Sequence, residues 1–559
     1  MKAKDKIVLL GIFLLFSSKN VKSYSNQIII NDKIIDISKP SGAGMSAGKD
    51  QTIINKGTIN VTGNKFTAGM KIDGAGREGI NEGIINHVGN GTDTSNAIVA
   101  QNGGYGENRN IVNVSGKNAS GLSAEKVGSK GINNGEINVS KSANGMKVTS
   151  KGEGINNGRI NVSSANSTGI LAIDSNSKAK NEGDIYVSGN SSAGISLTKG
   201  SSGENRGNIY VTAGQFTSGI KADGAKSEGI NSGKIIHVGN GQTSNAMLVQ
   251  NGGSIKNNGL VEVTGVNTSA MNSSGKGSKA LNDKKGQINI FDKASGMKIE
   301  NNGFGENAGT ISNYSTGIGM DIKVAGTGIN SGIVENYSTS SGVKVAGKFT
   351  NTGEIKNYGS GNAVLVSDGI FINDGGTIDG TNGVAIKSEV LRLKDSVTGK
   401  YYDAPTNNSV VLKGGKVIGN IIGGIGIDAL FLQGDNNLSD IKLENYEILS
   451  ATGGNSKIDS AFIDLEYNKG NKDYFETNKD KLENDGVITA DKGRLEISNS
   501  SLVVDFKNSL TDKTLENSII SADKLVLNGD ISFSFISGDG REEFNLSEAF
   551  GGVYIELGG

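Results

Sequence analysis

Several residue types are missing or scarce in this 559-residue chain, and each absence removes a class of protein. There is no cysteine and no tryptophan, and only two prolines and two histidines stand beside 85 glycines. The lack of cysteine excludes a disulfide scaffold, and so few prolines exclude a collagen-like triple helix. The 56 basic and 57 acidic residues leave a formal net charge of −1, which gives no electrostatic footprint for nucleic acid or anionic lipid.

The first residues predict export. Lysines at 2–6 precede an apolar run at 7–16, IVLLGIFLLF, which is too short to span a bilayer as a helix. Val21 and Ser23 fit the small-residue positions of a cleavage site. We therefore expect residues 1–23 to be a cleaved signal peptide of the Sec pathway, with an uncleaved anchor as the alternative.

A phrase of the form Asn-x-Gly-x-Ile-x-Val recurs along most of the chain. It reads NKGTINV at 55–61, NNGEINV at 133–139 and NNGRINV at 156–162, and it drifts to NTGEIKN at 351–357. Copies follow one another at 21 to 27 residues, about 25 on average, and their leading residues are Asn55, Asn81, Asn108, Asn133, Asn156, Asn181, Asn205, Asn231, Asn257, Asn282, Asn307, Asn330, Asn351 and Asn373. Such a period indicates a repeat architecture.

Each repeat also carries further strand signals. A second phrase places two small residues before apolar-x-apolar, as in NGMKV at 144–148 and SGVKV at 341–345, and an apolar residue such as Ile132 or Ile155 precedes the leading asparagine. Alternation with period 2 is typical of strands with one apolar face. Helical repeats would need longer segments of 3.6 periodicity with few glycines, and a disordered chain would not place isoleucine and valine so regularly.

These patterns predict an all-β fold, a single-stranded parallel β-helix (β-solenoid) with about 25 residues per coil and about 15 coils, capped by a less regular C-terminal β region. A single unit cannot bury its apolar faces alone, so successive units must stack. We expect Ile160 and Val162 to stack on Ile137 and Val139 of the preceding coil. A duplication supports this register, because residues 66–91 recur at an offset of 150 residues, or six coils.

The asparagine and the glycine of the main phrase are assigned structural roles. The stacked asparagines are expected to hydrogen-bond along the rod and to the turn backbone. The glycine two places later is kept in twelve of the fourteen copies, and Asn110 replaces it in another. Because glycine and asparagine both tolerate the left-handed conformation, we interpret this position, for example Gly158, as a left-handed corner between strands.

Two patterns that could indicate catalysis are better explained by the repeat. His87 and His237 are equivalents in the duplication and would lie about 29 Å apart, so they cannot share a metal ion. We expect them to face solvent or to pack in loops. The sequence GMSAG at 44–48 matches the G-x-S-x-G nucleophile motif, but no histidine and no strand–turn–helix pattern accompany it.

The candidate metal and carboxylate sites also have structural explanations. The stretch 423–430 matches one calcium-binding nonapeptide, a motif that binds calcium through tandem copies, so a glycine-rich turn is favoured over calcium at Asp428. Acidic residues in comparable turn positions lie on separate coils and are interpreted as a solvated edge: Glu82, Glu136, Asp184 and Glu354. We assign no catalytic, cofactor-binding or metal-binding residue.

From about residue 387 the 25-residue period fades and a different pattern follows. The residues in G-x-D-x-L-x-L-x-G spacing, with the strand elements after them, are Gly426, Asp428, Leu430, Leu432, Gly434, Tyr446, Glu447 and Leu449. This stretch resembles the C-terminal passenger segment of autotransporters (type V secretion). Together with the signal peptide and the repeats, the resemblance covers nearly the whole chain.

The resemblance implies a passenger that is secreted through an outer-membrane translocator barrel, and many such passengers are adhesins. It divides the chain into a repetitive solenoid at 24–387 and a C-terminal stem or cap at 388–559. The alternating segments of about ten residues that a barrel requires are not recognisable here. We therefore expect a barrel encoded separately, or a chain that is a fragment or a truncated product.

The function that we expect is contact with other surfaces, without catalysis. The protein would act as an adhesin at the cell surface, outer-membrane-associated or secreted, on an unknown host or bacterial glycan or protein, with exposed turns at 90–95 and 240–244 as contact residues. Two alternatives remain. One is a secreted β-helix enzyme that degrades polysaccharides, and the other is a rod that self-associates between cells.

Overall fold

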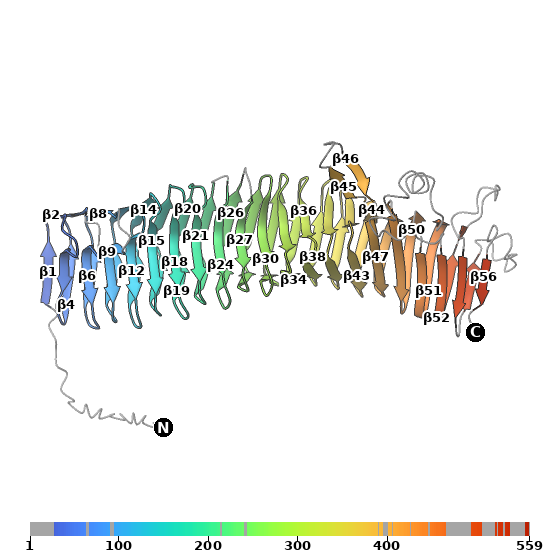
Figure 1. Cartoon of the computed structure of the whole chain (residues 1–559), viewed down its shortest axis with the longest axis horizontal. Coiled ribbons are helices and arrows are strands. Elements are labelled where there is room, and N and C mark those ends of the chain that lie inside the picture. The colour runs from blue at the N-terminus through green and yellow to red at the C-terminus, as the bar shows by residue number, and fades with distance from the viewer. Residues whose placement is uncertain are drawn as a thin grey trace, which may run out of the picture.

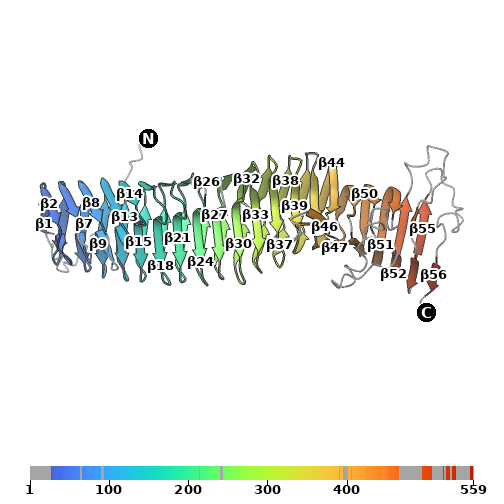
Figure 2. The same ribbon diagram turned by 45° about the horizontal axis from the view of Figure 1, so that its top comes forward.

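Short strands wind into a β-solenoid of about 16 turns with about 24 residues per turn. The computed structural model describes residues 27–62, 66–89, 94–212, 215–239, 243–389, 391–394, 401–404, 406–424, 426–444, 446, 448–464, 494–505, 520–521, 524–528, 532–536 and 554–557. The signal peptide predicted at 1–23 lies outside these residues. Figures 1 and 2 show the coils stacked along one axis from β1 to β56. The prediction of an all-β parallel solenoid is confirmed.

Every regular coil contributes three strands, so the rod has three faces. Face 1 ends at the leading asparagine and consists of β1 (Gln27–Asn31), β4 (Gln51–Asn55), β7 (Glu78–Asn81), β10 (Tyr105–Asn108), β13 (Lys130–Asn133), β16 (Glu153–Asn156), β19 (Lys178–Asn181), β22 (Ser202–Asn205), β25 (Glu228–Asn231), β28 (Ser254–Asn257), β31 (Lys279–Asn282), β34 (Phe304–Asn307), β37 (Thr327–Asn330), β40 (Lys348–Asn351) and β43 (Ile370–Asp374).

Face 2 carries the Ile-x-Val segments. It consists of β2 (Ile34–Ile37), β5 (Thr58–Val61), β8 (Ile84–Val88), β11 (Ile111–Ser115), β14 (Glu136–Ser140), β17 (Arg159–Val162), β20 (Asp184–Val187), β23 (Asn208–Val211), β26 (Lys234–Val238), β29 (Leu260–Thr264), β32 (Gln287–Phe291), β35 (Thr310–Asn313), β38 (Ile333–Asn336) and β41 (Glu354–Asn357).

Face 3 carries the small-small-apolar phrase. It consists of β3 (Ala43–Ala47), β6 (Ala68–Asp73), β9 (Ser95–Gln101), β12 (Ala119–Glu125), β15 (Asn144–Thr149), β18 (Thr168–Ile173), β21 (Ala193–Thr198), β24 (Ser218–Asp223), β27 (Ser244–Gln250), β30 (Thr268–Ser274), β33 (Ser295–Glu300), β36 (Ile318–Ile322), β39 (Ser341–Val345) and β42 (Asn362–Val366). Corner 1 joins faces 1 and 2, corner 2 joins faces 2 and 3, and corner 3 joins face 3 to the next coil.

The core is filled mainly from faces 2 and 3. Ile160 and Val162 are in register with the isoleucine and valine of the preceding coil and are at most 1% exposed, as predicted. Met146 supplies the equivalent core layer on face 3. On face 1 the inward position is a glycine in many coils, such as Gly154, but it is Ile255 or Phe349 in others; Ile155, after Gly154, lies on the outer side. Where this position is glycine, face 1 leaves room for larger side chains of face 3, as Gly154 does for Val148.

An unbroken ladder of asparagine side chains lies just inside corner 1. Each Nδ2 donates to the Oδ1 of the asparagine one coil further on, from Asn31 to Asn373, at 2.6–2.8 Å. The same Nδ2 also donates to the corner backbone, as Asn156 does to Gly158 O at 3.2 Å. The predicted structural role of these asparagines is confirmed. Because the amides lie inside, each must keep its partners to avoid an unsatisfied polar group.

The predicted reason for the glycine at corner 1 is wrong. Of the twelve glycines at this position, only Gly375 has a positive φ (75°). Gly158 is instead required by close approach, because a Cβ there would overlap the carbonyl oxygen of Gly135 in the coil below. Where Asn110 replaces the glycine, the hydrogen bond from Ile111 N to Gly83 O lengthens to 3.4 Å, against 2.9 Å for the equivalent bond from Arg159 N.

The left-handed residues lie at the other two corners. At corner 3, Ser150 and Lys151 have φ of 54° and 73°, and Gly128 has φ of 77°. At corner 2, Asn166 and Ser191 have φ of 56° and 54°. These corners reverse the chain through left-handed geometry, whereas corner 1 turns with the tight stacking that the asparagine ladder imposes.

The coil changes after the asparagine ladder ends. The strand β44 (Thr377–Ser388) pairs with both β41 and β42 and so covers two faces. Further strands continue the stack, several of them longer than before, namely β47 (Thr406–Lys413), β48 (Lys416–Ile422), β49 (Gly426–Gln433), β50 (Asn436–Glu444), β51 (Ile448–Asp464), β52 (Arg494–Asp505), β53 (Ile520–Ser521), β54 (Lys524–Asn528), β55 (Ser532–Ile536) and β56 (Tyr554–Leu557). The strands β45 (Leu391–Lys394) and β46 (Tyr401–Ala404) form a separate hairpin. Among the described residues, no helix is long and apolar enough to cross a bilayer.

Substitution of Gly158 tests the close-approach explanation. We expect Gly158→Asn and Gly158→Ala to lower the unfolding free energy alike, by about 1–3 kcal/mol, because any Cβ overlaps the backbone below. The matched control is Gly128→Asn, where φ is 77° and the Cβ would have space. Denaturant unfolding midpoints measure the effect. A Gly158→Asn variant as stable as the Gly128→Asn variant would restore the left-handed interpretation.

Candidate contact surface

Both histidines belong to the hydrophobic core, so their predicted position in solvent or in loops is wrong. His87 takes the place of the inward valine of face 2, between Val61 and Val114. His237 does the same between Val211 and Val263. The two side chains are at most 1% exposed. Neither imidazole can reach a substrate outside the rod.

Burial keeps both imidazoles neutral. Desolvation lowers the pKa of His87 to about 4 and the pKa of His237 to about 3. Nε2 of His87 lies 2.9 Å from Ser95 Oγ. Neither ring nitrogen of His237 has a hydrogen-bond partner among the described residues. Each imidazole is therefore a neutral side chain enclosed in the core.

The other chemical candidates, Ser46 and Asp428, lie on strands of the solenoid. Ser46 lies on β3 in register with Lys71 of the next coil, so the G-x-S-x-G match is part of a strand, as predicted. Asp428 is buried, and desolvation raises its pKa; its carboxylate accepts from Asn408 Nδ2 at 2.8 Å and from Gly424 N at 2.6 Å. Within the described part of the chain, no three potential ligands of the His, Cys, Asp or Glu type come together.

The acidic residues predicted as a solvated edge have surface partners. Glu82 pairs with Lys56 and Arg109, at 3.8 and 3.1 Å. Glu136 and Asp184 are separated by Arg159 of the intervening coil. No two of these carboxylates therefore face each other on adjacent coils in the way that glycoside hydrolysis requires.

A column of outward residues runs along corner 2, one position after the inward valine. Its members on successive coils are Thr62, Val88, Ser115, Ser140, Ser163, Ser188, Thr212, Val238, Thr264, Phe291, Tyr314, Tyr337 and Tyr358. The first part is mostly hydroxyl-bearing and the last four residues are aromatic. We name this set the corner-2 column.

The aromatic end of the corner-2 column was not predicted from the sequence. Phe291, Tyr314, Tyr337 and Tyr358 are 38–49% exposed, and their rings stack at 4.9–5.6 Å. Their planes are within 12–17° of each other, so the ring edges face outward. Aligning the repeats on their asparagines places these rings in one column, which is the signal that could have found them.

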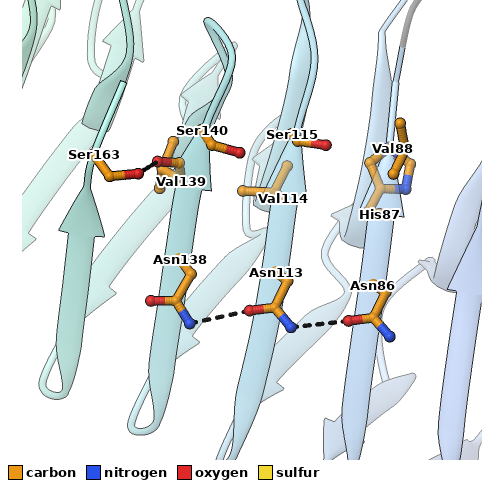
Figure 3. A pocket seen from close by; sticks show the side chains of 10 residues that line it. All are labelled: Asn86, His87, Val88, Asn113, Val114, Ser115, Asn138, Val139, Ser140 and Ser163. Atoms are coloured by element: carbon orange, nitrogen blue, oxygen red, sulfur yellow. Dashed lines mark hydrogen bonds between the residues drawn. The ribbon is translucent and has the colours of Figure 1, made fainter. Parts of the chain in front are cut away.

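The hydroxyl end of the column borders a groove of about 390 Å³ on face 2. Figure 3 shows Asn86, Asn113 and Asn138 in a row across it, with Ser115 and Ser140 beside them. The amides are joined by hydrogen bonds of 2.8 and 3.0 Å. Every lining residue is Asn, Ser, Val or the buried His87, so the groove has no charged wall.

Two exposed phenylalanines mark the duplicated coils at corner 2. Phe66 and Phe216 are 61% and 54% exposed and have φ of 47° and 52°. Other coils have smaller residues with positive φ at this register position, namely Ser41, Asn118, Ser142, Asn166, Ser191, Thr243 and Asn267. A bulky side chain in left-handed geometry is strained, and here it gains no burial in return.

The turns predicted as contact residues are only partly exposed. Ser95 and Ser244, the last residues of these turns, are at most 1% exposed. Both begin strands of face 3, where their side chains turn inward. Residues 90–93 and 240–242 lie outside the described part of the chain.

Comparison with known proteins gives only weak likeness. No family model and no curated protein matches this chain. Among solved structures, the crystal structure of a TibC-catalysed, hyper-glycosylated TibA fragment matches 65% of this chain and 96% of that chain, at 13% identity and a TM-score of 0.17. The assignment of the fold therefore rests on the strand pairing of this chain itself.

Because both histidines are buried, we predict that the protein loses stability in acid. Their folded pKa lies below the unfolded value of 6.5, so unfolding takes up protons, and the stability present above pH 6.5 falls as the pH drops towards 4. Each histidine lowers the unfolding free energy by about 1.4 kcal/mol per pH unit in this range.

The variant His237→Val separates this effect from general acid denaturation. Valine occupies the same position on the neighbouring coils, so the variant should match or exceed the wild type at pH 7 and lose less stability at pH 4.5. Thermal unfolding at both pH values measures the difference. Parallel pH curves for the variant and the wild type would show that His237 is charged in the folded protein.

Proposed function

We propose that this protein is an exported passenger of the autotransporter type, displayed at the cell surface, and that it acts by adhesion without catalysis. The observation that supports the proposal is a contrast between the interior and corner 2. Similar residues fill the interior of successive coils, whereas the exposed residues at corner 2 differ from coil to coil. The two histidines and Asp428 are enclosed in that interior. The residues that differ most from coil to coil, Phe66, Val88 and the aromatic end of the corner-2 column, are exposed.

The alternative of a secreted polysaccharide-degrading enzyme has less support. Such an enzyme needs two carboxyl groups on neighbouring coils, one of them held protonated as the acid. Asp428, with its raised pKa, is inside the rod and accepts hydrogen bonds from Asn408 and Gly424. The surface acids that the sequence indicated form ion pairs or lie apart.

Self-association between cells is the second candidate, and the aromatic end of the corner-2 column favours it. Four exposed rings on consecutive coils form a straight, largely apolar strip. Contiguous apolar surface of this kind is typical of protein contacts. The same strip on a second rod would offer a flat partner surface.

The test measures both attachment to cells and catalytic turnover of polysaccharides by the same protein. The mature chain would be coated on beads to score binding to host cells, to bacteria and to beads that carry the same chain, while the soluble chain is assayed on a polysaccharide panel. We expect attachment without turnover, and attachment unchanged in His237→Ala if that variant folds. Bead–bead clumping that is lost in Tyr314→Ser with Tyr337→Ser would support self-association instead. Turnover abolished by a single acid substitution, with no attachment, would contradict adhesion.

A further inference from the structure

We propose that the face 2 groove, with Phe66 at the adjoining corner, binds an uncharged linear glycan. This inference rests on the proposed adhesive function and specifies the chemistry of its ligand. Three observations carry it: the shape and composition of the groove, the unused hydrogen-bonding groups along it, and the strained exposed phenylalanine on the coil next to it.

The groove offers hydrogen-bonding groups that are already held in place. The amides of Asn86, Asn113 and Asn138 bond to one another along the rod, which fixes their orientation and leaves one N–H and one lone pair on each. The hydroxyls of Ser115 and Ser140 have no hydrogen-bond partner among the described residues. Fixed donors and acceptors reduce the entropy that a polar ligand loses on binding.

The spacing of these groups suits a polymer. The coils are about 4.8 Å apart, so the same amide and hydroxyl pair recurs at about that interval. The groove crosses four coils, from Asn86 to Ser163, and is therefore about 14 Å long. This length fits a few consecutive sugar rings of an extended glycan whose hydroxyls can donate and accept in turn.

The residues that line the groove disfavour a charged ligand. No lining residue is ionised, because His87 is neutral inside the core and the others are asparagine, serine and valine. A sulfated or carboxylated glycan would lose hydration here without gaining an ionic partner. A neutral sugar exchanges its water hydrogen bonds for those of the amides and hydroxyls.

Phe66 supplies the apolar contact that sugar rings need. It lies at corner 2 on the coil that precedes Val88, and Val88 lines the groove. Other coils keep serine, asparagine or threonine at this strained position, so the phenylalanine is not needed for folding. An exposed aromatic ring on the coil next to a polar groove can pack against the C–H face of a pyranose ring at the end of the glycan, while the groove binds its hydroxyls.

The duplication provides a matched control within the chain. Phe216 has the same exposure and geometry as Phe66, but the positions of Asn86 and Asn113 are occupied there by Ile236 and Glu262. The second corner therefore has the aromatic ring without the amide row. It should not bind the same ligand.

The experiment uses the mature chain and hexasaccharides as probes, measured by isothermal titration calorimetry and saturation-transfer NMR. The neutral probes are β-1,4-glucan, α-1,4-glucan and β-1,4-linked N-acetylglucosamine, and a heparin hexasaccharide serves as the anionic comparator. The groove variant is Ser115→Arg, and its control is Thr264→Arg at the equivalent place after Val238. The ring variant is Phe66→Ser, and its control is Phe216→Ser. Serine is native to this left-handed position, so both ring variants should fold as well as the wild type.

We expect at least one neutral probe to bind and the heparin probe not to bind. Ser115→Arg and Phe66→Ser should each weaken binding about tenfold or more, whereas Thr264→Arg and Phe216→Ser leave it unchanged. Absence of binding by all neutral probes, or binding unaffected by Ser115→Arg, would overturn the glycan site. If the Ser115→Arg variant attaches to cells as well as the wild type does, the glycan site is wrong but the adhesive function stands. If the wild type does not attach to cells, the adhesive function itself is wrong.

Discussion

The interaction on which the rest of the structure depends is the buried hydrogen bond between asparagine side chains of successive coils. It repeats from Asn31 to Asn373 without a break. Each amide donates upward, accepts from below and also bonds the backbone of corner 1, so a coil that slipped by one residue would leave buried amides unpaired. The ladder therefore fixes the register in which isoleucine lies on isoleucine and valine on valine. It also brings the backbones of adjacent coils so close at corner 1 that only glycine fits well.

This constraint separates the interior of the rod from its surface. Corner 1 is nearly constant in length, with two residues between most strands of faces 1 and 2, and the ladder continues where four residues follow Asn282. Corner 2 lies outside the ladder and accommodates turns of different length. It also accommodates bulky residues such as Phe66, and either hydroxyl or aromatic residues in the corner-2 column. Variation at this corner has a physical reason, because changes there do not disturb the stacking of the core. The groove that we propose binds a glycan and the aromatic end of the corner-2 column both border it.

Much of the architecture could be predicted from the sequence, because period-2 alternation and a fixed repeat length leave few alternatives to a solenoid. The asparagine ladder and the stacking of Ile160 on Ile137 followed from the same repeat. The reason for Gly158 did not, since a glycine required by close approach and one required by positive φ look identical in a sequence. His87 was misplaced because a polar residue at a core position contradicts the expectation that imidazoles face water. The corner-2 column was missed because its members share a position and not a residue type.

The most direct test of the ladder is the exchange of one of its buried amides for a carboxylate, compared with the same change in the row of asparagines on face 2 that includes Asn86, Asn113 and Asn138. Asn156→Asp removes the donor to Asn181 Oδ1, 2.6 Å away, and adds a buried charge, whereas Asn138→Asp alters a half-exposed residue of face 2. Hydrogen exchange of the backbone amides in β13, β16 and β19 would be followed in both variants. Our account predicts faster exchange in these strands and an unfolding free energy lower by about 3 kcal/mol or more for Asn156→Asp, with little change for Asn138→Asp. Equal exchange in the two variants would show that the inner asparagines do not hold the register.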